Sequence, residues 1–244
     1  MEHVTVKDLV LGSGGVLVSG SEEAPVSHIR LDSRQVEPGD LFVPLLGERV
    51  DSHRFLPQVM DQGAAAVLTS QELTLPEGGA GCAVIRVEDT KKALQKIGSY
   101  LRDRLTLPLV GVTGSVGKTT TREMIAAALS ARFRVYKTPG NSNSQVGVPV
   151  TLSEITENDQ VGVIELGMSE PGEMTVIANI ARVDMAVITN IGITHIGQLG
   201  SQENILREKL HITDGMKDGG LLILNGDDPL LKGVQGRVTQ KVRL

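Results

Sequence analysis

The sequence predicts an α/β protein of two domains: a small N-terminal α/β domain over residues 1–106, and a central domain over residues 107–244 with a mostly parallel sheet covered by helices. Two observations support this fold class. Apolar strand-like runs alternate with helical stretches, and the runs of the second half are apolar throughout, as in parallel strands buried on both faces. The chain also has 28 Gly, no Trp and two Tyr, so its core must be built from aliphatic side chains.

Four short apolar runs separated by turns are expected to form the strands of the N-terminal domain: VSHIRLDSR, DLFVPLLG, AAAVLTS and CAVIRVED. Between the second and third, HRFLPQVMDQGA predicts a helix with Phe55, Val59 and Met60 on one side. A second helix, TKKALQKIGSYLRDRL, has apolar residues at helical spacing: Ala93, Leu94, Ile97 and Leu101. The segment 106–108 is expected to be the hinge between the domains.

The central domain is predicted from five apolar runs: LPLVGV, FRVYKT, VGVIELG, DMAVITN and GLLILN. One of the helices between them, TREMIAAALSAR, places Met124, Ile125, Ala128 and Leu129 on one face. In parallel sheets ligands bind beyond the carboxyl ends of the strands, so residues that directly follow a strand are the candidates for function. The basic tail GRVTQKVRL is expected to be a solvated end.

Composition excludes several classes of protein. The net charge of −5 and the scattered Lys and Arg argue against a nucleic-acid binder. No apolar run approaches the roughly 20 residues that cross a bilayer, and the N-terminus does not resemble a signal peptide. The single cysteine, Cys82, lies beside an apolar run and is expected to be a small core residue. A cytoplasmic protein with no membrane span is therefore expected.

The segment GVTGSVGKTTT, residues 111–121, is predicted to bind the phosphates of a nucleotide. Its glycines follow the spacing G-x-x-G-x-x-G-K-T-T, with Val112 where the usual phosphate loop has glycine. Small residues still let backbone N–H groups and a helix N-terminus converge on phosphate oxygens. Lys118 would reach the β- and γ-phosphates, and Thr119 or Thr120 would offer a hydroxyl to Mg²⁺. A plain glycine-rich turn is disfavoured because strand, loop and helix occur in the required order.

Polar residues follow the other predicted strands, and each allows two interpretations. Glu165 could bind Mg²⁺ or be a solvated strand-end acid, and His195 could be a ligand or a structural residue. Asn225 could contact a base or ribose, or form an Asx turn. Lys209 lies on a helix, and its position alone predicts a solvated surface lysine. The placement of Lys118, Glu165, Asn190 and Asn225 at the ends of candidate strands favours a common site.

The phosphate-loop spacing and the segments IELGMSEPGEM and ITNIGITHIGQLGS…REK resemble the Mur ligases, the ATP-dependent amino-acid ligases of bacterial cell-wall synthesis. Within that family, TPGNSNSQVGVPVTL is similar to the branch that adds D-alanyl-D-alanine to UDP-N-acetylmuramoyl-tripeptide, and DSRQVEPGDLFVPLLGERVDSHRF to the UDP-sugar-binding domain. The resemblance covers roughly residues 26 to 231. It implies a UDP-sugar-binding N-terminal domain, an ATP-binding central domain, and a monomer.

The resemblance also implies roles for individual residues. Nucleotide contacts fall on Gly114, Ser115, Gly117, Lys118, Thr119, Thr120, Asn190 and Asn225. The metal ligands would be Thr119, Glu165, His195 and Lys209, the last carbamylated by CO₂, and two Mg²⁺ ions are expected. Lys118, Glu165, His195 and Lys209 would form the catalytic group. Ser33, Arg34, Thr138, Asn141 and Asn143 would contact the UDP-muramoyl-tripeptide.

The implied reaction converts the terminal carboxylate of the tripeptide into an acyl phosphate, which the amine of D-alanyl-D-alanine then attacks. Three features depart from the family pattern: Val116 in the phosphate loop, Ser52 in place of a usual glycine, and no C-terminal domain of about 150 residues. Two alternatives therefore stay open. One is a truncated, non-catalytic fragment that binds nucleotide and substrate; the other is a related amide ligase such as the diaminopimelate- or lysine-adding enzyme.

Overall fold

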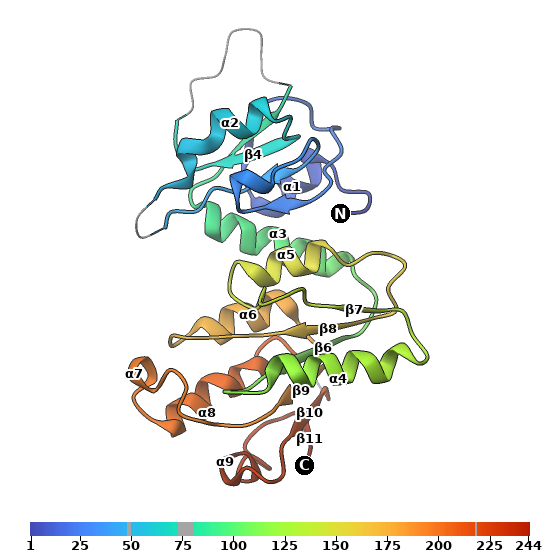
Figure 1. Ribbon diagram of the computed structural model, residues 1–244, viewed down its shortest axis with the longest axis vertical. Coiled ribbons are helices and arrows are strands. Elements are labelled where there is room, and N and C mark those ends of the chain that lie inside the picture. The colour runs from blue at the N-terminus through green and yellow to red at the C-terminus, as the bar shows by residue number, and fades with distance from the viewer. Residues whose placement is uncertain (48–49, 73–80, 218) are drawn as a thin grey trace. The chain divides into compact units, whose positions relative to one another are not determined.

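The computed structural model describes residues 1–47, 50–72, 81–217 and 219–244 (Figure 1). The chain divides into two compact units, Met1–Leu101 and Arg102–Leu244. Helix α3 contains the point of division, whereas the sequence placed the domain boundary just after this helix. No helix within the described residues is long and apolar enough to cross a membrane.

The N-terminal unit contains a five-stranded sheet of order β1-β5-β4-β3-β2, in which β2 to β5 are parallel and β1 is antiparallel to β5. Its strands are β1 (Val16–Ser19), β2 (Ile29–Arg30), β3 (Leu41–Phe42), β4 (Ala66–Thr69) and β5 (Ala83–Arg86). Its helices are α1 (Val6–Ser13), η1 (Ser33–Gln35), η2 (Ser52–Phe55), α2 (Leu56–Asp61) and α3 (Thr90–Arg104), the last shared with the second unit.

Local sequence accounts for the helices of the N-terminal unit. Thr5 and Asp8 form a capping box that begins α1, an element that the sequence did not predict. The predicted helix at HRFLPQVMDQGA is instead split into η2 and α2, because the Asp51 carboxylate accepts the His53 N–H and starts a 3₁₀ turn. The apolar face predicted for α3 is confirmed, since all four of its residues are buried. Cys82 is also buried in this core, as expected.

The central unit contains a sheet of six parallel strands, which confirms the predicted fold class. The order is β11-β10-β9-β6-β8-β7. Strand β6 therefore lies in the middle of the sheet, with the earlier strands β8 and β7 on one side and the later strands β9, β10 and β11 on the other. The strands are β6 (Leu109–Thr113), β7 (Val135–Lys137), β8 (Val161–Glu165), β9 (Met185–Ile188), β10 (Leu221–Leu224) and β11 (Lys241–Arg243). The helices are α4 (Lys118–Ser130), α5 (Gly147–Ser153), α6 (Glu173–Ala181), α7 (Ile196–Leu199), α8 (Gln202–Leu210), η3 (His211–Thr213) and α9 (Pro229–Lys232).

Helices cover both faces of this sheet, and Figure 1 shows α4 and α6 on opposite sides of β6 and β8. Helix α4 packs Ala126 against valines of β6 and β8, whereas α5, α6, α8 and α9 enclose the larger core on the other face. The face predicted for α4 is wrong in part, because Met124 is 68% exposed and Ala128 is also exposed. The helix is rotated so that Arg122 and Ala126 are buried instead.

The basic tail is not simply a solvated end. Its residues Lys241–Arg243 form β11, which pairs in parallel with β10. Val242 packs against the main core of the unit, while Lys241 and Arg243 are exposed. The prediction failed because a three-residue strand with one apolar position gives too weak a periodic signal to be separated from a polar tail.

Candidate active site

The phosphate loop joins the carboxyl end of β6 to the first turn of α4, as the sequence predicts. Gly117 has a φ of +81° and directly precedes the helix, a conformation that L-residues with side chains rarely adopt. Gly114 lets the backbone of the loop lie close against Thr189, because a Cβ at this position would be 1.9 Å from the Thr189 hydroxyl oxygen. The Lys118 ammonium donates to the Gly114 carbonyl at 3.1 Å, so the lysine folds back over the loop.

The end of β9 fixes the tip of this loop. The Val116 N–H donates to Asn190 Oδ1 and the Val116 carbonyl accepts from Asn190 Nδ2, both at 3.1 Å. The Thr189 hydroxyl donates to the same carbonyl at 2.6 Å. Ser115, which is buried, accepts from the Gly192 N–H through its hydroxyl at 2.9 Å. Asn190 therefore shapes the loop with its side chain, and the exposed Val116 keeps its backbone in place.

Glu165, at the carboxyl end of β8, is the point where several segments meet. Its side chain is 2% exposed, which excludes a solvated strand-end acid. Oε2 accepts the Thr119 hydroxyl at 2.9 Å, and Oε1 accepts the Asn143 amide at 2.8 Å. The Glu165 N–H donates to the buried Thr138 hydroxyl at 2.9 Å. One carboxylate thus joins the phosphate-loop helix to the segment 138–143, which the sequence linked to the acceptor substrate.

Arg122 is a charged group of this site that the sequence analysis missed. Its guanidinium is buried, lies 3.4 Å from Glu165 Oε2 and donates to the Gly140 carbonyl at 2.9 Å. The signal was present in the spacing, because a residue three positions after Thr119 on a helix shares its face. A basic residue on an amphipathic helix is normally solvated, so the sequence pattern alone did not indicate that Arg122 is buried.

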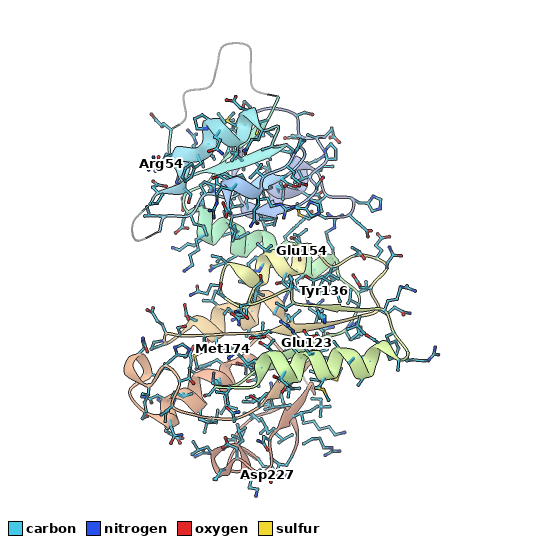
Figure 2. The ribbon with its side chains drawn as sticks, in the orientation of Figure 1. Arg54, Glu123, Tyr136, Glu154, Met174 and Asp227 are labelled. Atoms are coloured by element: carbon cyan, nitrogen blue, oxygen red, sulfur yellow. The ribbon has the colours of Figure 1, made fainter. Side chains whose placement is uncertain are left out.

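Lys209 is 3% exposed, so the surface position expected from its helix pattern is wrong. Burial, together with the positive charge of Lys118, lowers the pKa of Lys209 to about 8. Its neighbour Glu208 is also buried and accepts the Met174 N–H at 2.9 Å, which holds α8 against the start of α6 (Met174 is labelled in Figure 2). Lys209 is therefore held in the central unit within the electrostatic range of Lys118.

The remaining nucleotide-side candidates are less directly linked to this group. His195 follows β9 with a φ of +65° and caps the start of α7, and no hydrogen bond or ion pair found within the described residues joins its side chain to Glu165 or Lys209. Asn225 is exposed, and its Oδ1 accepts the Asp227 N–H at 3.0 Å, which is the Asx turn considered from sequence. Thr120 is exposed on the first turn of α4. Nowhere in the described ranges do three His, Cys, Asp or Glu side chains form a metal-binding group.

The candidates for acceptor binding lie in two places. Thr138 and Asn143 contact Glu165, and Asn141 is exposed between them in the central unit. Ser33 and Arg34 lie in η1 of the N-terminal unit, where Ser33 is buried and Arg34 exposed. The Arg34 guanidinium donates to its neighbour Asp32 at 2.6 Å, and this hydrogen bond lowers the pKa of Asp32 to about 2.

Comparisons with known proteins agree with this geometry. The family model described as Mur ligase middle domain matches residues 112–243, and that described as Mur ligase family, catalytic domain, matches residues 25–101. The chain belongs to the Mur ligase family. A Mur ligase of Bacillus subtilis, UDP-N-acetylmuramoyl-tripeptide–D-alanyl-D-alanine ligase, is 43% identical over 93% of this chain and 50% of its own length.

Solved structures of other Mur ligases are similar as well. MurF from Acinetobacter baumannii has a TM-score of 0.89 and 32% identity, over 98% of this chain and 52% of that chain. MurF ligase from Thermotoga maritima, solved in complex with ADP, has a TM-score of 0.79 and 30% identity, over 89% of this chain and 49% of that chain. The chain thus spans about half the length of the relatives it matches.

The residues present suit a nucleotide and a hard cation. The loop offers a left-handed glycine at a helix N-terminus and a lysine beside it, which is the arrangement that accommodates a phosphate chain. Thr119 and Glu165 place a hydroxyl and a carboxylate oxygen 2.9 Å apart, and such oxygens are the ligands that Mg²⁺ prefers. This donor set fits Mg²⁺ better than a soft metal, since the only cysteine of the chain is buried in the other unit.

Proposed function

We propose that this chain carries the nucleotide- and acceptor-binding parts of an ATP-dependent ligase that joins D-alanyl-D-alanine to UDP-N-acetylmuramoyl-tripeptide. The observation that carries the proposal is the position of Glu165, whose carboxylate binds Thr119 of the phosphate-loop helix and Asn143 of the acceptor-side segment. The relatives named for this reaction support it, because the similarity covers both units.

In the proposed reaction a carboxylate oxygen of the tripeptide attacks the γ-phosphorus of ATP, and ADP leaves. The acyl phosphate that forms is an electrophile, whereas the free carboxylate repels an attacking amine. The amine of D-alanyl-D-alanine then attacks the carbonyl carbon and phosphate leaves, giving an amide. Lys118 would neutralise charge on the transferring phosphoryl group, which is the main contribution that proteins make to such transfers.

Mg²⁺ would be held by Thr119 and Glu165, and when bound it would offset negative charge on the phosphate oxygens. His195 and Lys209 are proposed as further ligands on the family resemblance, Lys209 in carbamylated form. The lowered pKa of Lys209 supports this role, because a larger share of its amine is neutral near pH 8 and only the neutral amine reacts with CO₂. Ser33 and Arg34 of the N-terminal unit are proposed to contact the UDP-sugar.

Phosphate release tests the proposal. The chain is incubated with MgATP, with and without UDP-N-acetylmuramoyl-tripeptide, alone and mixed with the remaining half of a relative such as the Bacillus subtilis ligase. We expect release that requires the tripeptide, and amide formation only with D-alanyl-D-alanine in a panel of amine acceptors. Release that is independent of the tripeptide in both samples would refute the ligase function. Nucleotide binding without turnover in either sample would indicate a non-catalytic binding role.

A further inference from the structure

A fixed positive charge lies beside the carboxylate to which the proposed function assigns a cation. The Arg122 side chain is 5% exposed, and its Nη1 is 3.4 Å from Glu165 Oε2. The same Oε2 accepts the Thr119 hydroxyl. Arg122 and Thr119 therefore contact the same carboxylate oxygen that would bind the cation. Nothing in the proposed phosphoryl transfer requires an arginine at this position, and its presence calls for a separate explanation.

Arg122 is held in place independently of Glu165. Its Nη1 donates to the Gly140 carbonyl at 2.9 Å, and its Nη2 and Nε donate to Glu123 Oε1 at 2.7 and 3.2 Å. Glu123, labelled in Figure 2, is the neighbouring residue on α4. These bonds use the planar fork of the guanidinium on two sides. The charge therefore remains near Glu165 when a cation approaches.

Glu165 thus shares its paired cation with Glu123, and the guanidinium is the charged group in contact with Oε2. Arg122 already compensates the carboxylate, and two further lysines, Lys118 and Lys209, lie close enough to each other to interact electrostatically. A divalent cation that arrives alone would meet like charges in a buried, weakly screened place. The phosphate chain of a nucleotide over Lys118 would reverse this balance, because it brings several negative charges.

We propose that Arg122 is a positioning residue that makes cation binding at Glu165 dependent on bound nucleotide. The inference rests on the proposed function in one respect, the assignment of Glu165 as a cation ligand. Arg122 orients the carboxylate through Oε2 and, by its fixed charge, keeps the affinity for a free cation low. The cation is then retained only together with the phosphate chain that it must neutralise.

Binding of Mn²⁺, a paramagnetic substitute for Mg²⁺, tests this inference in the 244-residue chain. Free Mn²⁺ is measured by electron paramagnetic resonance in titrations with and without saturating ADP. The variants are Arg122→Gln, which removes the charge and keeps a polar side chain, and Arg122→Lys, which keeps the charge. Glu123→Gln is the matched control, because it removes the outer partner of Arg122 and leaves the contact with Glu165.

In the wild-type chain we expect Mn²⁺ to bind at least about tenfold more weakly without ADP than with it. Arg122→Gln should tighten nucleotide-free Mn²⁺ binding at least about fivefold, since a fixed like charge is gone. Arg122→Lys should keep the wild-type ratio, and Glu123→Gln, which removes a negative charge from Arg122, should not tighten nucleotide-free Mn²⁺ binding. The gain should disappear in the double variant Arg122→Gln/Glu165→Gln, which identifies the ligand. A purely structural role of Arg122 would weaken Mn²⁺ binding instead.

The inference is overturned if Arg122→Gln shows the wild-type affinities with and without ADP, if no Mn²⁺ binds in any variant, or if Arg122→Lys behaves like Arg122→Gln. Circular dichroism checks folding, and Arg122→Met replaces the glutamine variant should the latter unfold. Failure of the proposed function can be told apart from failure of this inference, because it appears as the absence of tripeptide-dependent phosphate release with the wild-type chain. Mn²⁺ binding does not require the tripeptide.

Discussion

Each of the two units buries a carboxylate beside an arginine, and the two carboxylates differ in where their partners come from. Asp40, 1% exposed, accepts from Arg30 Nε at 2.8 Å, from the Glu37 N–H at 3.0 Å, and contacts His28 Nδ1 at 3.2 Å. All three partners lie within 12 residues of it in sequence. Asp40 therefore fixes the turn between β2 and β3.

Glu165 has side-chain partners that lie 22 to 46 residues away in sequence, on two separate segments, helix α4 and the segment 138–143. Two of them, the Thr119 hydroxyl and the Asn143 amide, are neutral donors that can exchange for a cation at low cost compared with an ion pair. On the proposed role of Glu165, burial and an arginine alone would not separate a cation-binding carboxylate from a structural one. The features that separate Glu165 from Asp40 are neutral, long-range donors at the carboxyl end of a parallel strand, next to a helix N-terminus.

The largest effect should come from Glu165→Gln, which keeps the shape of the side chain and removes its charge. We expect tripeptide-dependent phosphate release to fall by about 10³-fold, a loss typical of removing one electrostatic contributor. Stability should change less than in the equivalent Asp40 variant, because Arg122 retains Glu123 as a partner. Release within a few-fold of wild type would remove Glu165 from the proposed machinery.

Asp40→Asn should have the opposite profile. Because it leaves the half-buried Arg30 without its charged partner, it should lower the free energy of unfolding of the N-terminal unit by up to about 3 kcal/mol, the lower end for a broken buried pair. Nucleotide affinity of the central unit should be unchanged. Urea denaturation and ADP titration measure the two quantities, and Glu37→Gln is the control, since only its backbone N–H contacts Asp40. Weakened ADP binding in Asp40→Asn would contradict the division of roles.

Lys209→Met tests the cost of a buried ammonium. The pKa of Lys209 is lowered to about 8 in the folded chain, against its ordinary value of 10.5 in the unfolded one. The unfolded state therefore binds more protons between these values, so the penalty is full below pH 8 and vanishes above pH 10.5. At pH 7 the variant should be more stable by up to about 3 kcal/mol. Urea denaturation from pH 7 to 10.5 in CO₂-free buffer measures the difference, and a stability gain that persists at high pH would contradict it.

Cys82 serves as a reporter of the N-terminal unit, and the smallest effect is expected on its labelling in Glu165→Gln. Burial raises the pKa of its thiol to about 12, so the native chain should react very slowly with a thiol reagent at pH 8. Labelling should accelerate in Asp40→Asn by the factor by which the population of the opened N-terminal unit rises. It should stay at the wild-type rate in Glu165→Gln. Equal acceleration in both variants would mean that the two units do not open separately.

The sequence could predict the features that depend on short-range pattern. The five central strands, the phosphate loop and the buried face of α3 follow from apolar runs, glycine spacing and helical period. The rotation of α4 was not predictable, because Met124 and Ala126 are equally compatible with its period and only the contact with β6 and β8 decides between them. The burial of Lys209 and Arg122 depends on partners far away in sequence, so their pattern on the helix indicates a surface position.

Strand β11 has a consequence for how the chain meets other copies of itself. It forms the outer margin of the central sheet, where unpaired backbone groups could accept a further strand. The side chains of Lys241 and Arg243 are exposed there, and an approaching identical margin would place cation against cation. Replacing both by neutral residues should therefore favour edge-to-edge aggregation of the 244-residue chain, so these two cations act against self-association along β11.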